Sequence, residues 1–228
     1  MNAADQQSSL DWNEGVPVAR RFDDPYFSLQ DGLAETQHVF LKGNGLPERF
    51  ADGFHIAELG FGTGLNLLCT SASWLETRRP GSLLFTSFEA FPLEIDETAR
   101  ALNAFPALNG LAEELLQALR TNNRSFTLCG SIHVQIIEGD ARMTLPIWQK
   151  KADAWFLDGF SPAKNPELWE PSLMQAVAEH TNERGSFATY TAAGYVRRAL
   201  SDAGFDVTRV PGFGRKRHMS VGRLRSAA

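Results

Sequence analysis

The sequence predicts an α/β fold: a mostly parallel, seven-stranded sheet that ends in an antiparallel hairpin and follows an N-terminal cap. Strand-like and helical stretches alternate from His55 onward, which is typical of a parallel sheet covered on both faces. The last two strand-like stretches are joined only by a short turn rich in Gly and Pro, so they must pair antiparallel, because parallel neighbours need a long crossover.

Buried, β-branched or aromatic runs predict the strands, and wider apolar spacing predicts the helices. The expected strands are His55–Leu59, Ser82–Phe88, Ser125–Leu128, Ile132–Ile137, Asp153–Leu157, Ser186–Thr191, Phe205–Val210 and His218–Leu224. The expected helices are Leu65–Thr77, Leu93–Asn103, Gly110–Leu119, Pro166–His180 and Ala193–Ala203. Cys129-Gly130-Ser131 between two strands is a plausible hairpin turn. Pro171 either belongs to the first turns of its helix or marks a restart.

Length and composition favour one structural domain, with residues 1–50 as the cap and residues 51–228 as the core. The first 14 residues, Met1 to Glu14, lack the basic start and apolar stretch of a secretory signal. The two cysteines, Cys69 and Cys129, have no metal-ligand spacing and cannot form a disulfide framework, so we expect no metal and a cytoplasmic location.

Charge is distributed unevenly along the chain. Residues 180–228 carry nine Lys and Arg against three Asp and Glu, whereas the net charge of the whole chain is −5. A basic end on an acidic body fits either a local phosphate contact or a solvated basic face, and charge alone favours the solvated face.

A glycine loop, Glu58-Leu59-Gly60-Phe61-Gly62-Thr63-Gly64, follows the first core strand, where ligands of such sheets bind. Its glycines allow the backbone to pass under a ligand, and the alternative is simply a tight strand–helix turn. A pyrophosphate would favour a loop without acids, whereas Glu58 suits a cofactor with an amino group and no phosphate. With the antiparallel hairpin, this loop predicts the Rossmann-like class I fold of S-adenosylmethionine-dependent methyltransferases.

Acids also end the next strands. Glu89 is placed to accept both ribose hydroxyls, and Asp140 to accept from an adenine amino group, although either could be a helix cap or a surface acid. The residues expected to bind S-adenosylmethionine are Glu58, Gly60, Gly62, Gly64, Asn66, Glu89, Asp140 and Ala141.

A long, turn-rich segment, residues 157–166, follows the fourth parallel strand, where the methyl acceptor should lie. Asp158 could hold an amine and take its proton, and Phe160 could stack on a flat ring. The alternative is that Asp158 only caps the following turn.

Several segments together resemble the methyltransferase family formed by the corresponding domain of the bifunctional tRNA-modification protein MnmC and its stand-alone counterpart MnmD. The resemblance rests on residues 22–28, 35–36 with 39–41, 60–66, 157–160 with 162–166, and 212–217. It implies methylation of the aminomethyl group on the wobble uridine of tRNA, which gives the 5-methylaminomethyl form, often 2-thiolated. A flavin-dependent oxidase would then act in the same pathway, and the chain could be stand-alone or half of a longer protein.

The same resemblance implies contacts with the anticodon region of tRNA. The implied substrate-binding residues are Phe160, Tyr26, Lys164, Arg197, Arg198, Arg215, Lys216 and Arg217, with Asp158 as the catalytic residue. Core packing is an equally good interpretation for either aromatic residue, and for Tyr26 it is slightly favoured.

Three other functions stay open at this point. They are an N-methyltransferase acting on a small-molecule or protein amine, an aminopropyl transferase of the same fold, and a non-catalytic tRNA-binding module. Four acids at ligand-facing positions (Glu58, Glu89, Asp140 and Asp158) argue against a silent module.

Overall fold

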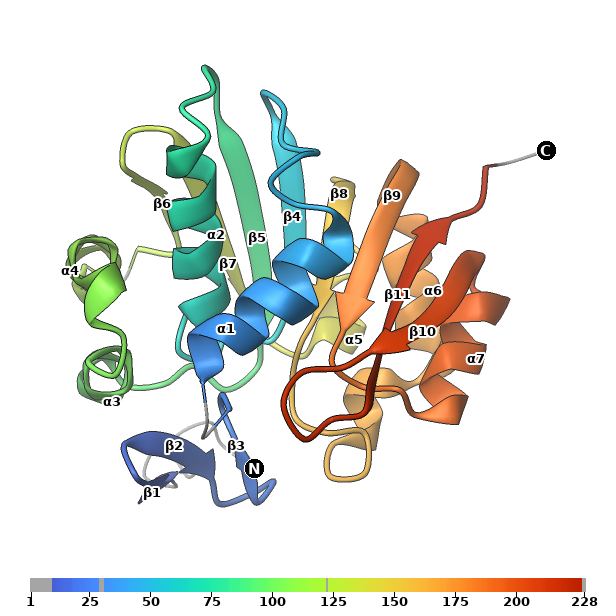
Figure 1. Ribbon diagram of the computed structural model, residues 1–228, viewed down its shortest axis with the longest axis horizontal. Helices are drawn as coiled ribbons and strands as arrows, with labels where there is room; N and C mark the ends of the chain where they lie inside the picture. The colour runs from blue at the N-terminus through green and yellow to red at the C-terminus, as the bar shows by residue number, and fades with distance from the viewer. Residues whose placement is uncertain (1–9, 29–30, 122, 227–228) are drawn as a thin grey trace.

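A central sheet lies between two layers of helices in the computed structural model, which describes residues 10–28, 31–121 and 123–226 (Figure 1). Its strands within these residues are β4 (Phe54–Leu59), β5 (Leu83–Glu89), β6 (Ser125–Leu128), β7 (Ile132–Glu138), β8 (Ala152–Leu157), β9 (Thr181–Thr189), β10 (Phe205–Pro211) and β11 (His218–Leu224). Their spatial order is β10-β11-β9-β8-β4-β5-β7-β6. The five central strands are parallel, and β11 pairs antiparallel with both β9 and β10. The predicted fold class is therefore confirmed.

The sheet has eight strands among the described residues, whereas a seven-stranded sheet was expected. Each of the eight stretches expected to be strands joins this one sheet, including Ser125–Leu128, which forms β6 and pairs antiparallel with β7 at the sheet edge. Cys129 and Gly130, with φ of 48° and 68°, form the tight turn between them. Residues 129–131 connect the paired Leu128 and Ile132, and the turn is closed by the N–H of Ser131, which donates to the carbonyl oxygen of Leu128 at 3.2 Å. The left-handed conformation of Cys129 and Gly130 lets β6 fold directly back onto its neighbour.

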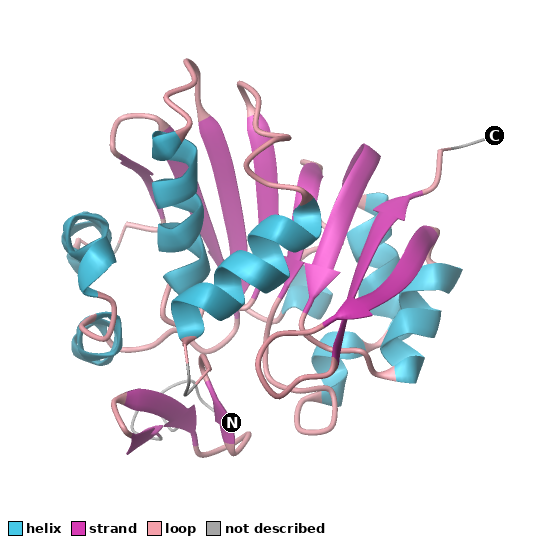
Figure 2. Ribbon diagram, viewed as in Figure 1, coloured by secondary structure: helices cyan, strands magenta, loops and turns pink. Residues whose placement is uncertain are grey.

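Helices cover both faces of the sheet (Figure 2). Their bounds are α1 (Gly32–Thr36), α2 (Leu65–Glu76), α3 (Ile95–Leu102), α4 (Asn109–Arg120), α5 (Ala141–Thr144), α6 (Pro171–Glu179) and α7 (Gly194–Asp202). Helix α1 continues into a π-helical turn at Gln37–Leu41 and a 3-10 turn at Lys42–Asn44. Residues of α2, α4 and the π-helical turn share one apolar cluster with the sheet, and residues of α6 and α7 share a second.

Several predicted elements differ from the structure, including β9, which begins at Thr181 rather than at the expected Ser186. The helix expected over Pro166–His180 is split into a 3-10 turn, Pro166–Trp169, and α6, because Pro171 begins a new helix and has no N–H to continue the old one. Helix α5 was not expected, because a helix of one turn has no apolar periodicity to detect.

The segment before β4 forms a small antiparallel sheet of β1 (Leu10–Asn13), β2 (Val16–Ala19) and β3 (Asp24–Pro25), followed by α1. Figure 1 shows this small sheet beside the carboxyl ends of the central strands. The expected cap spans residues 1–50, of which 1–9 and 29–30 lie outside the described residues. None of the described helices is long and apolar enough to cross a membrane.

Candidate active site

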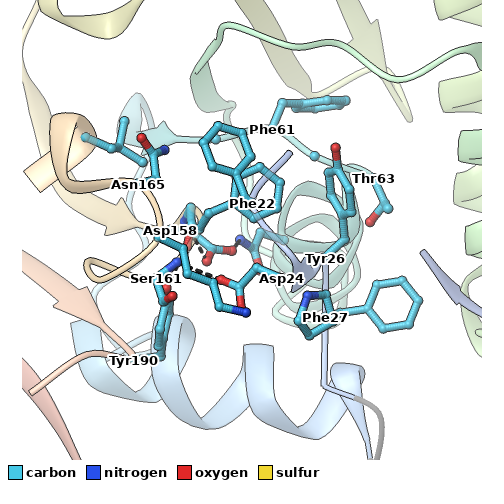
Figure 3. A pocket seen from close by; sticks show the side chains of 18 of the residues that line it. Phe22, Asp24, Tyr26, Phe27, Phe61, Thr63, Asp158, Ser161, Asn165 and Tyr190 are labelled. Atoms are coloured by element: carbon cyan, nitrogen blue, oxygen red, sulfur yellow. Dashed lines mark hydrogen bonds and ion pairs between the residues drawn. The ribbon is translucent and has the colours of Figure 1, made fainter. Parts of the chain in front are cut away.

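A pocket of about 820 Å³ opens at the carboxyl ends of the parallel strands. Its wall includes residues that directly follow β4, β5, β7 and β8. Strands β5 and β8 lie on opposite sides of β4, so the order in which strands are added to the sheet reverses at β4. Open α/β sheets bind ligands at such a point. Figure 3 shows Phe22, Tyr26, Phe61 and Asp158 around this pocket.

The glycine loop follows β4 and has an unusual backbone. Gly60, Gly62 and Gly64 have φ of 89°, 53° and 79°, values that residues with a side chain rarely adopt. A Cβ at Gly60 would lie 2.8 Å from the carbonyl oxygen of Asp158, and one at Gly62 would lie 3.1 Å from Cδ1 of Tyr26. Gly60 and Gly62 line the pocket, whereas Gly64 lies at the start of α2 and packs against Leu115.

Glu89 ends β5 and is almost completely buried. Its Oε2 accepts the N–H of Gly62 at 2.9 Å, and its Oε1 accepts the N–H of Phe91 at 2.6 Å. Burial raises the pKa of this carboxyl, and the backbone N–H groups act against that shift. Each oxygen keeps further lone pairs, so the carboxylate could also accept hydroxyl groups of a ligand.

Asp140 and Ala141 line the pocket where α5 begins. Asp140 caps this helix by accepting the N–H of Arg142, and it pairs with the Arg142 guanidinium at 2.6 Å. The hydrogen bond from the Arg142 side chain lowers the pKa of Asp140. The side chain is thus an ionised helix cap at the edge of the pocket.

Asp158 follows β8, and its carboxylate is held on both oxygens. Oδ2 accepts Nδ2 of Asn66 at 2.8 Å, and Oδ1 accepts the N–H of Gly159 at 2.9 Å. Burial raises the pKa of Asp158 to about 7. Asp158 therefore caps its own turn and also presents a carboxyl group to the pocket that can change protonation near neutral pH.

Glu58 lies behind the pocket wall, which differs from its expected place beside a ligand. Its side chain is completely buried, and its oxygens are bonded to Ser87 Oγ at 2.6 Å and Asn66 Nδ2 at 2.8 Å. Burial raises the pKa of Glu58 well above its usual value. All residues of β4 are buried, and the hydrogen bond from Asn66 places the Glu58 carboxyl group beside the first turn of α2.

Phe160 and Tyr26 meet in an aromatic cluster on the pocket wall. The ring of Phe160 stacks on Phe22 with centroids 4.4 Å apart, and Tyr26 approaches it edge-on at 5.2 Å. Arg21 lies over Phe22 and over Phe91. Phe22 of the N-terminal segment therefore covers one face of Phe160, and this contact was not expected from the sequence.

Lys164 is paired with that same segment. Its Nζ donates to the carbonyl oxygen of Asp23 and lies 3.1 Å from Oδ2 of that residue. Asp24 accepts the N–H of Ser161 at 2.7 Å. These contacts tie the loop after β8 to β3 and form one side of the pocket.

The basic residues divide into two groups. Arg215 and Lys216, in the turn between β10 and β11, line the pocket. Lys216 pairs with Oε1 of Glu35 at 2.9 Å, and its Nζ lies 4.0 Å from the centroid of the Tyr190 ring. Arg217, Arg197 and Arg198 do not line the pocket.

Glu35, Thr36 and Tyr190 are pocket residues to which sequence reasoning gave no role. Glu35 and Thr36 stand in one of the segments that carried the family resemblance, which was the available signal. Tyr190 follows β9, and its hydroxyl donates to the carbonyl oxygen of Gly159 at 2.6 Å. Another strand end thus contributes to the same wall.

A parallel sheet ended by an antiparallel hairpin, with a glycine loop and acids at successive strand ends, defines the class of S-adenosylmethionine-dependent methyltransferases. Residues 103–225, more than half of the chain, match a family described as S-adenosyl-L-methionine-dependent methyltransferase. The chain belongs to this family, which confirms both the enzyme class and the cofactor expected from the sequence.

Two curated relatives are similar over nearly the whole chain. Both are tRNA 5-methylaminomethyl-2-thiouridine biosynthesis bifunctional proteins MnmC. The protein from Marinobacter nauticus is 44% identical over 96% of this chain, and that from Stutzerimonas stutzeri is 43% identical over 97%. The chain spans only 37% and 35% of their lengths.

Solved structures give the same fold. The crystal structure of MNMC2 from Aquifex aeolicus matches with a TM-score of 0.80 at 24% identity and covers 96% of this chain and 70% of that one. A glycopeptide N-methyltransferase, MtfA, complexed with S-adenosyl-L-methionine matches at 0.51 and 16% identity, over 89% of this chain and 97% of that one.

Proposed function

We propose that this chain transfers the methyl group of S-adenosylmethionine to the amine of 5-aminomethyl-(2-thio)uridine at the wobble position of tRNA. The product would be 5-methylaminomethyl-(2-thio)uridine. The observation that carries this proposal is the 44% identity with an MnmC protein over 96% of the chain. Because the chain spans 37% of that relative, the proposal concerns only methyl transfer and leaves out the second activity of a bifunctional protein.

The pocket fits the cofactor on two observations. The positive φ angles of Gly60 and Gly62 leave backbone along the pocket without side chains, and Glu89 offers free lone pairs beside it. We expect Glu89 to accept the ribose hydroxyls. Asp140 and Ala141 would border the adenine, and Gly64 would shape the loop from behind. When bound, the cofactor supplies a methyl group that a lone pair can attack.

Asp158 would receive the acceptor amine. An alkylamine like that of lysine has a pKa near 10, so about one molecule in a thousand is free base at neutral pH. The ammonium form has no lone pair and must lose a proton before it can react. A carboxyl group whose pKa is about 7 can bind the ammonium as a carboxylate and take the proton while remaining within the pocket.

Recognition of tRNA would combine stacking with phosphate contacts. Tyr26 and Phe160 line the pocket and would offer aromatic surface to a base that has been turned out of the anticodon loop. The proposed phosphate contacts are Arg197, Arg198, Arg215, Lys216 and Arg217, and Lys164 would act indirectly through the N-terminal segment. A tRNA substrate would also place the chain in the cytoplasm, with a flavin-dependent oxidase in the same pathway.

The decisive experiment incubates the protein with methyl-labelled S-adenosylmethionine and tRNA that lacks the final methyl group. After digestion, the label should appear only in 5-methylaminomethyl-(2-thio)uridine. Label on a free amine or on a protein would support the N-methyltransferase alternative, and absence of transfer with tight tRNA binding would support a non-catalytic module. Transfer of an aminopropyl group from decarboxylated S-adenosylmethionine would support the third alternative, an aminopropyl transferase of the same fold.

A further inference from the structure

Asn66 connects five elements of the fold through hydrogen bonds. Its Nδ2 donates to Glu58 and to Asp158, both at 2.8 Å. Its Oδ1 accepts the hydroxyl of Thr36 at 3.0 Å. Glu58 in turn is bonded to Ser87. These residues stand on α1, α2, β4, β5 and at the end of β8.

These contacts fix the orientation of the amide group. An amide nitrogen has two N–H donors, and both are used by carboxyl oxygens. Reversing the amide would point its oxygen at two carboxyl groups and its nitrogen at a hydroxyl, so the observed orientation is the favoured one. Both N–H groups of Asn66 are therefore used within the protein, and a cofactor contact could come only from the second lone pair of its Oδ1.

We propose that Asn66, held in place by Thr36 and Glu58, is the positioning residue that keeps Asp158 in its ionised, pocket-facing form. The proposal deepens the function proposed above, because it assigns control of the catalytic carboxylate. The reason is electrostatic: an N–H directed at a carboxylate stabilises the charged form over the neutral one. Thr36 is necessary because it prevents the amide from rotating away from Asp158.

Other charged groups also face Asp158. Glu58 and Glu35 approach from β4 and α1, Lys216 from the β10–β11 turn, and Tyr190 from the segment after β9. Glu35 acts to raise the pKa of Asp158 and Lys216 acts to lower it. Their charges have opposite sign, so their effects on Asp158 oppose one another, and the two side chains also form an ion pair. The carboxylate accepts direct hydrogen bonds from two neutral donors, the backbone N–H of Gly159 and the side-chain amide of Asn66, and of these only the Asn66 amide is a side chain that can be substituted.

The test measures protonation of Asp158 directly in the complete chain without cofactor. Aspartate labelled with ¹³C at the carboxyl carbon is titrated by NMR, and Asp158→Asn identifies the resonance. The variants are Asn66→Leu, Thr36→Val and Thr36→Ser. Thr36→Val removes only the hydroxyl, whereas Thr36→Ser keeps it and serves as the matched control.

We expect the Asp158 midpoint to rise by about one to two pH units in Asn66→Leu, the range of a hydrogen bond to a charged group. Thr36→Val should raise it by roughly half a unit to one unit, and Thr36→Ser should leave it unchanged. An unshifted midpoint in Asn66→Leu, or equal midpoints in the two Thr36 variants, would overturn the proposal. If Asn66→Leu does not fold, the Thr36 pair still decides the question.

A kinetic measurement separates this inference from the proposed substrate. Single-turnover methylation of tRNA by Thr36→Val should be slow at pH 7 and recover at higher pH by the same shift, which simple loss of structure would not produce. If the wild-type protein methylates no tRNA, the proposed function fails. The NMR midpoints still decide whether Asn66 and Thr36 control Asp158, because they require no substrate.

Discussion

The carboxylate of Glu89 accepts the backbone N–H of Gly62 at 2.9 Å, so the acid that ends β5 also holds the glycine loop that follows β4. Both were expected to bind the cofactor. Their direct bond makes the loop conformation depend on the acid. Substitution of Glu89 should therefore affect binding in two ways, through lost ligand contacts and through a looser loop.

We expect Glu89→Ala to lose S-adenosylmethionine affinity by about 1–3 kcal/mol, roughly 5- to 150-fold in Kd, because ribose hydroxyls and the Gly62 N–H would lose their acceptor. Glu89→Gln keeps one oxygen and should lose less. Isothermal titration calorimetry measures both. Wild-type affinity in Glu89→Ala would remove Glu89 from the cofactor site.

Gly62→Ala should weaken cofactor binding, because φ of 53° is strained for alanine and its Cβ would press on Tyr26 at 3.1 Å. The matched control is Gly130→Ala in the β6–β7 turn. Gly130 has φ of 68° but no atom within 4 Å of a built Cβ. Both variants should lose about 1 kcal/mol of stability from backbone strain in thermal unfolding. Only Gly62→Ala should bind cofactor more weakly in calorimetry, and an equal loss in the control would refute the local explanation.

The fold and the positions of the main acids could be predicted because both depend on local patterns. Strand and helix periods, the glycine loop, and acids at strand ends are visible within a few residues. Glu89, Asp140 and Asp158 all reach the pocket wall for this reason. Glu58 was also placed at a strand end, but local pattern does not say that its side chain turns beneath α2.

Contacts between distant segments could not be predicted. Lys216 pairs with Glu35 across 181 positions of sequence, and Asn66 meets Thr36 and Asp158 only after α1, α2 and β8 have packed together. Strand β3 has two residues, too few for any period-2 pattern. Of the pocket wall that the N-terminal segment builds, only Tyr26 was therefore expected.

The basic turn should contribute to tRNA binding mainly through Arg215 and Arg217, because Lys216 is engaged with Glu35. We expect Arg215→Gln with Arg217→Gln to reduce the log–log salt slope of tRNA binding by roughly 1.4–1.8 units, at about 0.7–0.9 per lost phosphate contact. Fluorescence anisotropy across salt concentrations measures the slope.

The charge-matched control is Arg78→Gln with Arg184→Gln, two exposed residues near the amino ends of β5 and β9. This pair should leave the slope unchanged. Equal slopes for the wild type and the Arg215/Arg217 variant would assign the turn to a solvated surface.

Glu58 should make the fold less stable as pH rises. Its pKa is raised in the folded state, so the stability that its proton supplies is complete below the unfolded pKa near 4.3 and is lost as pH increases toward the folded pKa. Gln keeps an oxygen for Asn66 and offers an N–H to Ser87. Urea unfolding at pH 5 and pH 8 should therefore show a smaller drop in stability for Glu58→Gln than for the wild type. An equal drop in both proteins would mean that Glu58 is ionised when folded.

Asp158 should control the methyl-transfer rate through its ionised form. Its pKa is raised to about 7, so the carboxylate fraction, and with it the rate, should increase through neutral pH and level off above it. Asp158→Asn cannot accept a proton and should lose roughly 10²–10⁴ in rate while it still binds cofactor. Single-turnover methylation at saturating tRNA, measured from pH 5.5 to 9, checks both expectations. Lys216→Gln should move the rising limb to higher pH, since Lys216 lowers the pKa of Asp158. A rate for Asp158→Asn near that of the wild type at pH 7 would leave Asp158 as a turn cap, with the amine proton lost to solvent.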